Sequence, residues 1–206
     1  MDSNGFEYVD LGLPSGTLWA TCNVGADDPY HRGLYFQWGS TVGYRENDVL
    51  NLVKRFNSDY RDYDFALRSY CGFNKYNKYN NDDLLEVLEL EEDAAHAYMG
   101  GDWRMPIKED FDELLFNTIP VGFDNKVNGI MFKSLRNNKE LFMIGTDFVG
   151  DGFFKNHNRD ILLWSASSSS RLTRYDCGCS FHANIFTRST CYNYRFLGFN
   201  VRGVLK

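Results

Sequence analysis

The alternation of apolar and polar residues near the start of the chain predicts two strands. Residues 7–11 (EYVDL) and 16–24 (GTLWATCNV) each alternate or run apolar over the length of a strand. Pro14, Ser15 and Gly16 join them and favour a turn. We therefore predict an opening β-hairpin.

Two helices are predicted between residues 91 and 115. Residues 91–93 (EED) place acidic side chains at the first turn of an alanine-rich run, where they offset the helix dipole, and Gly100 and Gly101 end that run. A second helix is expected after Pro106, because apolar residues follow at i, i+3 and i+4: Phe111, Leu114 and Leu115.

Strand-length segments dominate the second half of the chain. Apolar runs at residues 129–134, 141–144 and 161–165 are separated by Asn, Gly and Asp clusters, and residues 198–204 read as a closing strand. Cys179, Phe181 and Ala183 alternate with polar residues. Residues 40–81 are instead polar, rich in Asn and Tyr, and weakly periodic, so we expect long ordered loops that form an insertion without a chemical motif.

Composition favours one domain over the whole chain. The 206 residues are 43% apolar and 17% aromatic, with only 4 Pro. A chain of this length buries roughly 70% of its unfolded surface, enough for a substantial core. The many aromatic residues favour a loop-rich fold whose irregular segments are anchored by aromatic side chains. They do not favour a helical bundle.

The C-terminal segment lacks five amino acids. Between Ser165 and Leu205 there is no Lys, Glu, Gln, Trp or Met, although the other 165 residues contain 28 of these, a rate at which about seven would be expected here. Lys and Glu are usual on solvated surfaces. Randomising the adenines of AAC or AAT codons, with the third base kept a pyrimidine, yields most amino acids but excludes these five.

This segment resembles the variable region of proteins that are diversified by diversity-generating retroelements. Residues 164–167 (WSAS) and 195–202 (RFLGFNVR) are similar to the invariant ends of such regions. Residues 8–26 and 33–39 (GLYFQWG) resemble the start of domains with the formylglycine-generating-enzyme type of C-type-lectin-like fold. Residues 103–106 (WRMP), between the two predicted helices, resemble its Arg-Leu-Pro-Thr turn. We expect Arg104 in that turn to satisfy buried carbonyls or a carboxylate.

The resemblance covers most of the chain and implies both its fold and its division into a scaffold and a variable region. It implies an α+β, C-type-lectin-like fold of the formylglycine-generating-enzyme type, loop-rich, with two helices and small antiparallel sheets. Residues 1–163 would be the scaffold of this single domain, 1–206, and residues 164–206 its variable ligand-binding region.

We expect no enzyme activity, because the residues that such chemistry needs are missing. Formylglycine-generating enzymes bind copper through two cysteines separated by four residues, whereas here Cys177, Cys179 and Cys191 have other spacings. The four His are scattered without metal-ligand spacing. The calcium motifs of sugar-binding C-type lectins are also absent, so no cofactor is expected, although a structural calcium ion elsewhere stays compatible with the sequence. The odd number of five Cys favours reduced thiols.

The variable segment contains the residue types that dominate protein interfaces. Aromatic and Arg side chains give large contact area or several hydrogen bonds for little lost entropy. For Phe181 a place in the core is the alternative. The predicted ligand-binding residues are Arg171, Leu172, Arg174, Tyr175, Cys177, Cys179, Phe181, His182, Asn184, Ile185, Phe186, Arg188, Thr190, Cys191, Tyr192, Tyr194, Phe196 and Leu197.

The charge and the hydropathy of the chain limit the classes of partner that it can be expected to bind. The net charge of −6 argues against nucleic acid. Residues 165–206 carry +5 and the remainder −11, which favours an anionic glycan or an acidic protein patch, unless diversification left Arg there by chance. Neither a membrane-spanning apolar run nor a signal peptide is recognisable, so we expect no membrane insertion.

These features together predict a diversified receptor-binding protein, with the virion tail of a phage as its location and an extracellular action. The partner would be a cell-surface protein or glycan of a host bacterium, met by a broad face, and a homo-oligomer would raise avidity. The alternative is an undiversified adhesin domain of the same fold on a bacterial surface. A formylglycine-generating-type oxidase ranks third.

Overall fold

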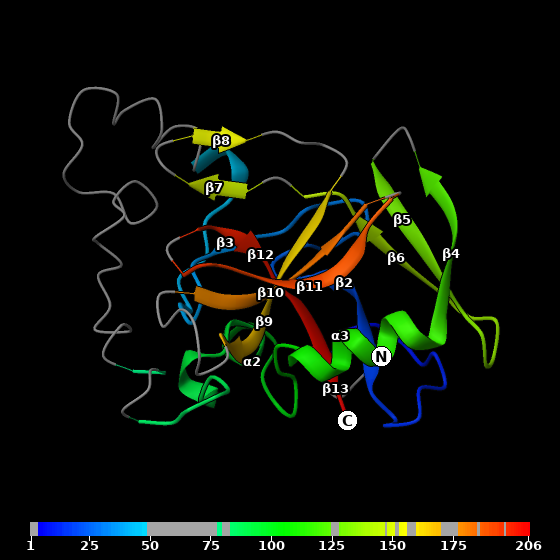
Figure 1. Cartoon of the computed structure of the whole chain (residues 1–206). Helices are drawn as coiled ribbons and strands as arrows, with labels where there is room; N and C mark the ends of the chain where they lie inside the picture. Colours follow the sequence, from blue (N-terminus) through cyan, green and yellow to red (C-terminus); the bar gives the residue numbers. More distant parts are fainter. Residues whose placement is uncertain are drawn as a thin grey trace.

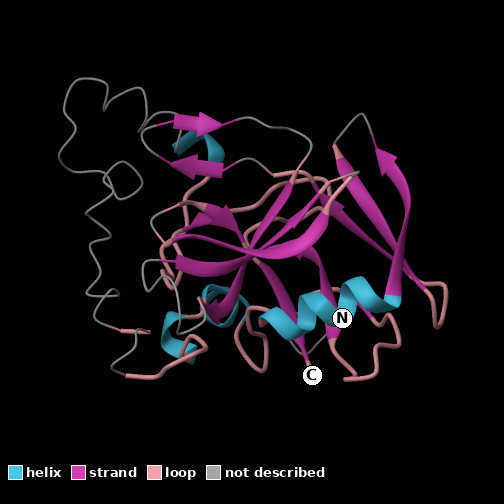
Figure 2. Cartoon of the chain, in the orientation of Figure 1, coloured by secondary structure: helices cyan, strands magenta, loops and turns pink. Residues whose placement is uncertain are grey.

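The protein is α+β, with few helices and small antiparallel sheets in the part of the chain that the structure describes (Figures 1 and 2). The computed structural model describes residues 4–48, 78–79, 83–124, 128–146, 148–150, 153–155, 160–169, 177–184, 186–195 and 197–206. Most of the predicted insertion at 40–81 lies outside these ranges, at residues 49–77 and 80–81.

The C-terminal segment forms most of the largest sheet. Its five strands lie in the order β11 (Arg188–Tyr194), β10 (Cys177–Ala183), β9 (Ile161–Ser168), β12 (Phe199–Asn200) and β3 (Tyr35–Phe36). Neighbouring strands are antiparallel except β12 and β9, which run parallel. The strand predicted at 161–165 is therefore confirmed as part of β9, and β11 is an edge strand.

The predicted opening hairpin is confirmed. β1 (Tyr8–Val9) pairs antiparallel with β2 (Leu18–Asn23), and β13 (Arg202–Leu205) pairs with the other edge of β2. The predicted closing strand at 198–204 is instead two strands, because β12 belongs to the five-stranded sheet and β13 to this one. The chain changes sheets at Val201, whose carbonyl accepts from the Val24 N–H at 2.8 Å.

A third sheet contains β4 (Thr118–Asp124), β5 (Gly129–Ser134) and β6 (Glu140–Ile144), all antiparallel. β5 and β6 confirm the predictions at 129–134 and 141–144. β4 was not predicted, because Pro120 and Gly122 weaken a strand pattern, yet an edge strand with a bulge tolerates both. β7 (Phe148–Gly150) and β8 (Phe153–Lys155) pair separately.

Both predicted helices are confirmed. A 3-10 turn, η2 (Leu90–Glu92), precedes α2 (Ala94–Met99), whose N-terminus is capped by the Asp93 side chain. Gly100 ends α2 with φ 68°, a left-handed conformation that favours glycine. α3 (Lys108–Asn117) buries Phe111 and Leu114, as their spacing predicted.

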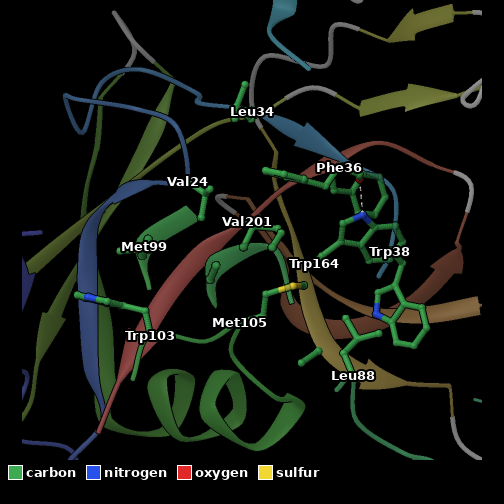
Figure 3. Packing of buried hydrophobic residues seen from close by; sticks show 14 of the residues in the cluster. Val24, Leu34, Phe36, Trp38, Leu88, Met99, Trp103, Met105, Trp164 and Val201 are labelled. Carbon is green, nitrogen blue, oxygen red and sulfur yellow. Dashed lines mark hydrogen bonds between the residues drawn. The ribbon is translucent and has the colours of Figure 1, made fainter. Parts of the chain in front are cut away.

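The five-stranded sheet has a core on each face. One cluster surrounds Trp164 and includes Phe36, Trp38 and Trp103 (Figure 3). The other contains Leu163 of β9 and Phe111 of α3. Successive residues of a strand point to opposite faces, so Leu163 and Trp164 serve different clusters. β9 is buried on both sides and forms the centre of the molecule.

Candidate functional site

The two ends of the C-terminal segment lie side by side in the core. The rings of Trp164 and Phe199 are both buried, with centroids 4.3 Å apart. Asn200 pairs with Leu163 across the parallel strands, and its side-chain amide donates to the carbonyls of Arg32 and Leu34, each at 2.8 Å. The two ends of the segment therefore meet in the core, and strands β10 and β11 lie between them in the sequence.

Arg195 makes a second attachment further along the segment. Its buried guanidinium donates to the carbonyls of Cys177 at 3.3 Å, Lys78 at 3.0 Å and Tyr79 at 2.6 Å. The same group stacks over the Trp38 ring, 4.6 Å from its centroid. Carbonyl acceptors and an aromatic face compensate for the lost hydration of this charge. Arg195 therefore joins the start of β10 to residues 78–79.

Arg202 is also buried, and this changes the electrostatic prediction. Its guanidinium donates to Asn23 Oδ1 at 2.8 Å and to the Ala20 carbonyl at 3.0 Å, and burial lowers the pKa of Arg202 to about 10. Arg195 and Arg202 supplied two of the positive charges that favoured a cationic ligand face. Because both are buried, neither belongs to an exposed cationic surface, and the predicted cationic ligand face would rest on the other basic residues of the segment.

Three predicted ligand-binding residues belong to the core. Cys177, Cys179 and Phe181 of β10 are buried, and Phe181 stacks on Phe111 with centroids 4.6 Å apart and planes 4° from parallel. Their prediction as surface contacts is therefore wrong. The reason is that β10 is an inner strand, covered by β9 and β11 at its edges and by α3 on one face. Burial raises the pKa of Cys179 to about 12.

The neighbouring edge strand β11 carries exposed predicted residues. Arg188 is exposed, Tyr192 is 44% exposed and Tyr194 is 38% exposed. Thr190 and Cys191 are half-buried. Every second residue of β11 points to the same face of the sheet, and this face carries Arg188, Thr190, Tyr192 and Tyr194. Across the antiparallel strands these residues pair, in the same order, with Ala183, Phe181, Cys179 and Cys177 of β10.

The remaining predicted residues have varied environments. Phe186 is almost fully exposed in the turn between β10 and β11, which Asn184 builds by accepting from the N–H groups of Phe186 and Thr187, each at 2.8 Å. His182 is half-buried, with Nε2 3.2 Å from Asp160 Oδ2, and Leu197 packs against the Trp164 cluster. The others lie outside the described residues: Arg171, Leu172, Arg174, Tyr175, Ile185 and Phe196.

The sequence did not identify a scaffold residue that contacts this strand. Thr190 Oγ1 donates to Asp112 Oδ1 of α3 at 3.4 Å. Asp112 also pairs with Lys108 one turn earlier in the helix. Asp112 falls within the second predicted helix, but the neighbouring strand could be found only from the tertiary structure.

The structural role predicted for Arg104 is confirmed. Its Nη1 and Nη2 donate to the two carboxylate oxygens of Asp110 at 2.6 Å and 3.2 Å, and Nη1 also reaches the Met105 carbonyl at 3.0 Å. Asp110 accepts from the Ile107 N–H at 2.8 Å as well. The turn before α3 is thus held by a bidentate ion pair.

The cysteines of the described ranges form no disulfide bond: Cys22, Cys177, Cys179 and Cys191. Within the described ranges, no three His, Cys, Asp or Glu side chains gather where they could hold a metal ion. Nor does any helix among these residues have the length and apolar character needed to cross a membrane.

A hollow of about 560 Å³ lies away from β11, beside the loop that follows β2. Among its charged residues, His31 pairs with Asp27 and Arg32 with Glu46, each at 3.0 Å. The residues that line it lie between Gly25 and Ile144, outside residues 164–206, so this hollow is separate from the candidate site.

Comparisons with protein-family models, with curated proteins and with solved structures find no match to this chain. The candidate site is therefore defined by the geometry of residues 164–206 alone. It consists of a buried frame, formed by Trp164, Arg195, Phe199 and Arg202, and an exposed edge strand, β11.

Proposed function

We propose that this chain is a diversified ligand-binding protein with a C-type-lectin-like fold of the formylglycine-generating-enzyme type. Residues 164–206 would be its variable region, and its role would be receptor recognition by a phage tail. One observation carries the proposal: the frame residues of the segment are buried, whereas β11 between them carries exposed side chains at the sheet edge, at Arg188, Tyr192 and Tyr194.

This separation suits a surface that must change without unfolding the protein. Substitution of buried residues costs several kcal/mol, whereas exposed substitutions usually change stability by about 0.5 kcal/mol or less. Trp164 and Phe199 hold the segment at its ends. Side chains at Arg188, Tyr192 and Tyr194 can then vary at little cost to folding.

The chemistry of the exposed residues supports recognition of a macromolecule. Tyr and Arg are enriched among the residues that contribute most to interfaces. Arg188, Tyr192 and Tyr194 form an open row rather than a closed cavity. We propose a cell-surface protein or glycan of a host bacterium as the partner, and the proposal needs neither a catalytic residue nor a cofactor.

The gene sequence tests the diversification. We expect a near-identical template repeat close to the gene, next to a reverse transcriptase, with differences confined to adenines of the template. The codons for residues 188, 190, 192 and 194 should be among those that differ. Absence of a template repeat would contradict diversification and favour the undiversified adhesin.

Binding to cells tests recognition. If a phage carries the gene, the test panel contains host bacteria of that phage; if a bacterium carries it, the panel contains relatives of that bacterium. The labelled full-length chain should bind bacteria in this panel. The combined variant Arg188→Ala, Tyr192→Ala, Tyr194→Ala should lose at least about tenfold in apparent affinity, because it removes the exposed aromatic and cationic contacts. Tyr30→Ala, at another exposed aromatic residue, is the control and should bind normally. Equal binding by all three proteins would contradict the proposed face.

A further inference from the structure

Helix α3 presents an exposed flank on the side of β11. Lys108, Asp112 and Phe116 are spaced at i, i+4 and i+8, so they lie on successive turns of one side of the helix. The Lys108 and Asp112 side chains are 37% and 46% exposed, and Phe116 is 88% exposed. A Phe this exposed at the end of a ten-residue helix contributes little to the fold.

The flank is continuous with the face of β11 that carries Arg188, Thr190, Tyr192 and Tyr194. The half-buried Thr190 donates to Asp112 at 3.4 Å, and Lys108 donates to the other carboxylate oxygen of Asp112. The pKa of Lys108 is raised, chiefly by its hydrogen bond to Asp112, which agrees with a formed ion pair. The helix and the strand therefore present one surface with Asp112 at the junction.

The position of the helix against the sheet is fixed. Phe111, on the buried side of α3, stacks on Phe181 of β10. At the N-terminus of the helix, the Lys108 N–H donates to Ser167 Oγ of β9 at 3.0 Å. A ligand that contacts β11 therefore meets α3 at a constant offset, whatever side chains the strand carries.

We propose that Lys108, Asp112 and Phe116 form the constant half of the recognition face and contact a protein ligand beside the variable residues of β11. This inference rests on the proposed function. Phe116 supplies an aromatic anchor that is already exposed, so binding gains its buried area without unfolding any structure.

The charges on this surface favour a protein over a polyanionic glycan. A polyanion needs several unpaired cations. In the described part of this surface Arg188 is exposed, but Lys108 is paired with Asp112, and Arg195 and Arg202 are buried. The described part of the surface instead combines aromatic side chains with a paired acid and base. This composition is typical of protein interfaces, in which aromatic anchors are surrounded by polar groups.

A selection experiment tests the inference. The full-length chain, randomised at Arg188, Thr190, Tyr192 and Tyr194, is displayed on yeast and selected against ovalbumin as the probe protein. Phe116→Ala is then introduced into several independent binders. We expect most of them to lose at least about tenfold in affinity, with an unchanged melting temperature. The matched control is Tyr30→Ala, which removes an exposed aromatic side chain that packs on Phe142 of β6 and should change affinity by less than about twofold.

Each outcome has a distinct meaning. If the library yields no ovalbumin binders, the proposed function fails. If binders arise but Phe116→Ala behaves like Tyr30→Ala, the function stands and the constant α3 contact is overturned. A parallel selection against dextran sulfate should yield binders that do not depend on Phe116. Equal dependence there would overturn the preference for a protein ligand.

Discussion

At the residue scale, aromatic side chains of the C-terminal segment have opposite environments. Phe199 is buried, 4.3 Å from the Trp164 ring and 6.1 Å from the Phe148 ring, measured between centroids. Tyr192, seven residues earlier, is 44% exposed on the edge strand. The same residue class therefore stabilises the fold at one position and is available to a ligand at the other.

This contrast predicts different responses to truncation. Phe199→Ala should lower the free energy of unfolding by about 3–5 kcal/mol, through lost burial and the cavity left beside Trp164. Tyr192→Ala should change it by less than about 1 kcal/mol, because the exposed ring has few partners to lose. Urea denaturation followed by tryptophan fluorescence measures both values. A large loss of stability in Tyr192→Ala would mean that β11 is part of the core and that the recognition face lies elsewhere.

At the element scale, one buried carboxylate joins α2 to the turn that precedes α3. Asp93 accepts from the His96 N–H at 2.9 Å, which caps α2, and from the Met105 N–H at 2.7 Å. Burial is the largest influence on this group and raises the pKa of Asp93 above its ordinary value of 3.8. The stabilisation that Asp93 gives to the connection between α2 and the turn before α3 therefore depends on pH.

The sign of that sensitivity follows from proton linkage. Because the pKa of Asp93 is raised on folding, the folded state binds more protons than the unfolded state between pH 3.8 and the folded pKa. The contribution of Asp93 to the free energy of unfolding therefore falls as the pH rises through this window. The stability difference between wild type and Asp93→Asn should decrease over the same window and be constant above it. Urea titrations at a series of pH values measure this difference; a difference that rises with pH would contradict the raised pKa.

At the scale of the whole molecule, strands from both ends of the chain share one sheet. β1 and β13 flank β2 on its two edges. The five-stranded sheet meets this sheet where the chain passes from β12 to β13. The buried residues that frame the C-terminal segment are thus supported by both halves of the sequence.

A broad, variable face predicts modest affinity per copy and strong avidity. Such a face samples many weak contacts, so high apparent affinity requires several linked copies. A trimer made by fusing the chain to a coiled coil should bind whole host cells about 10²–10⁴-fold more tightly than the monomer. Flow cytometry over a concentration series measures both. Equal nanomolar binding by monomer and trimer would argue for a single tight site.

Local patterns were sufficient for the elements whose signals lie within a few residues. The acids at 91–93 and Gly100 delimited α2, the spacing of Phe111 and Leu114 indicated α3, and Pro14 to Gly16 indicated the hairpin turn. The role of Arg104 was predicted from the resemblance of residues 103–106 to an Arg-Leu-Pro-Thr turn between two helices. β4 was missed, because Pro120 and Gly122 are unfavourable in most strands and acceptable only at an edge.

The sequence by itself determined the helices, most of the strands and the unusual composition of residues 165–205. Only the tertiary structure decided which residues of that segment face water. Phe181 and Tyr192 both lie in short alternating strands, yet Phe181 is buried against Phe111 and Tyr192 is exposed. Alternation shows that a strand has two faces, but burial depends on which distant elements cover each face and each edge. For Phe181 these are β9, β11 and α3, and such long-range contacts leave no signal in the local pattern.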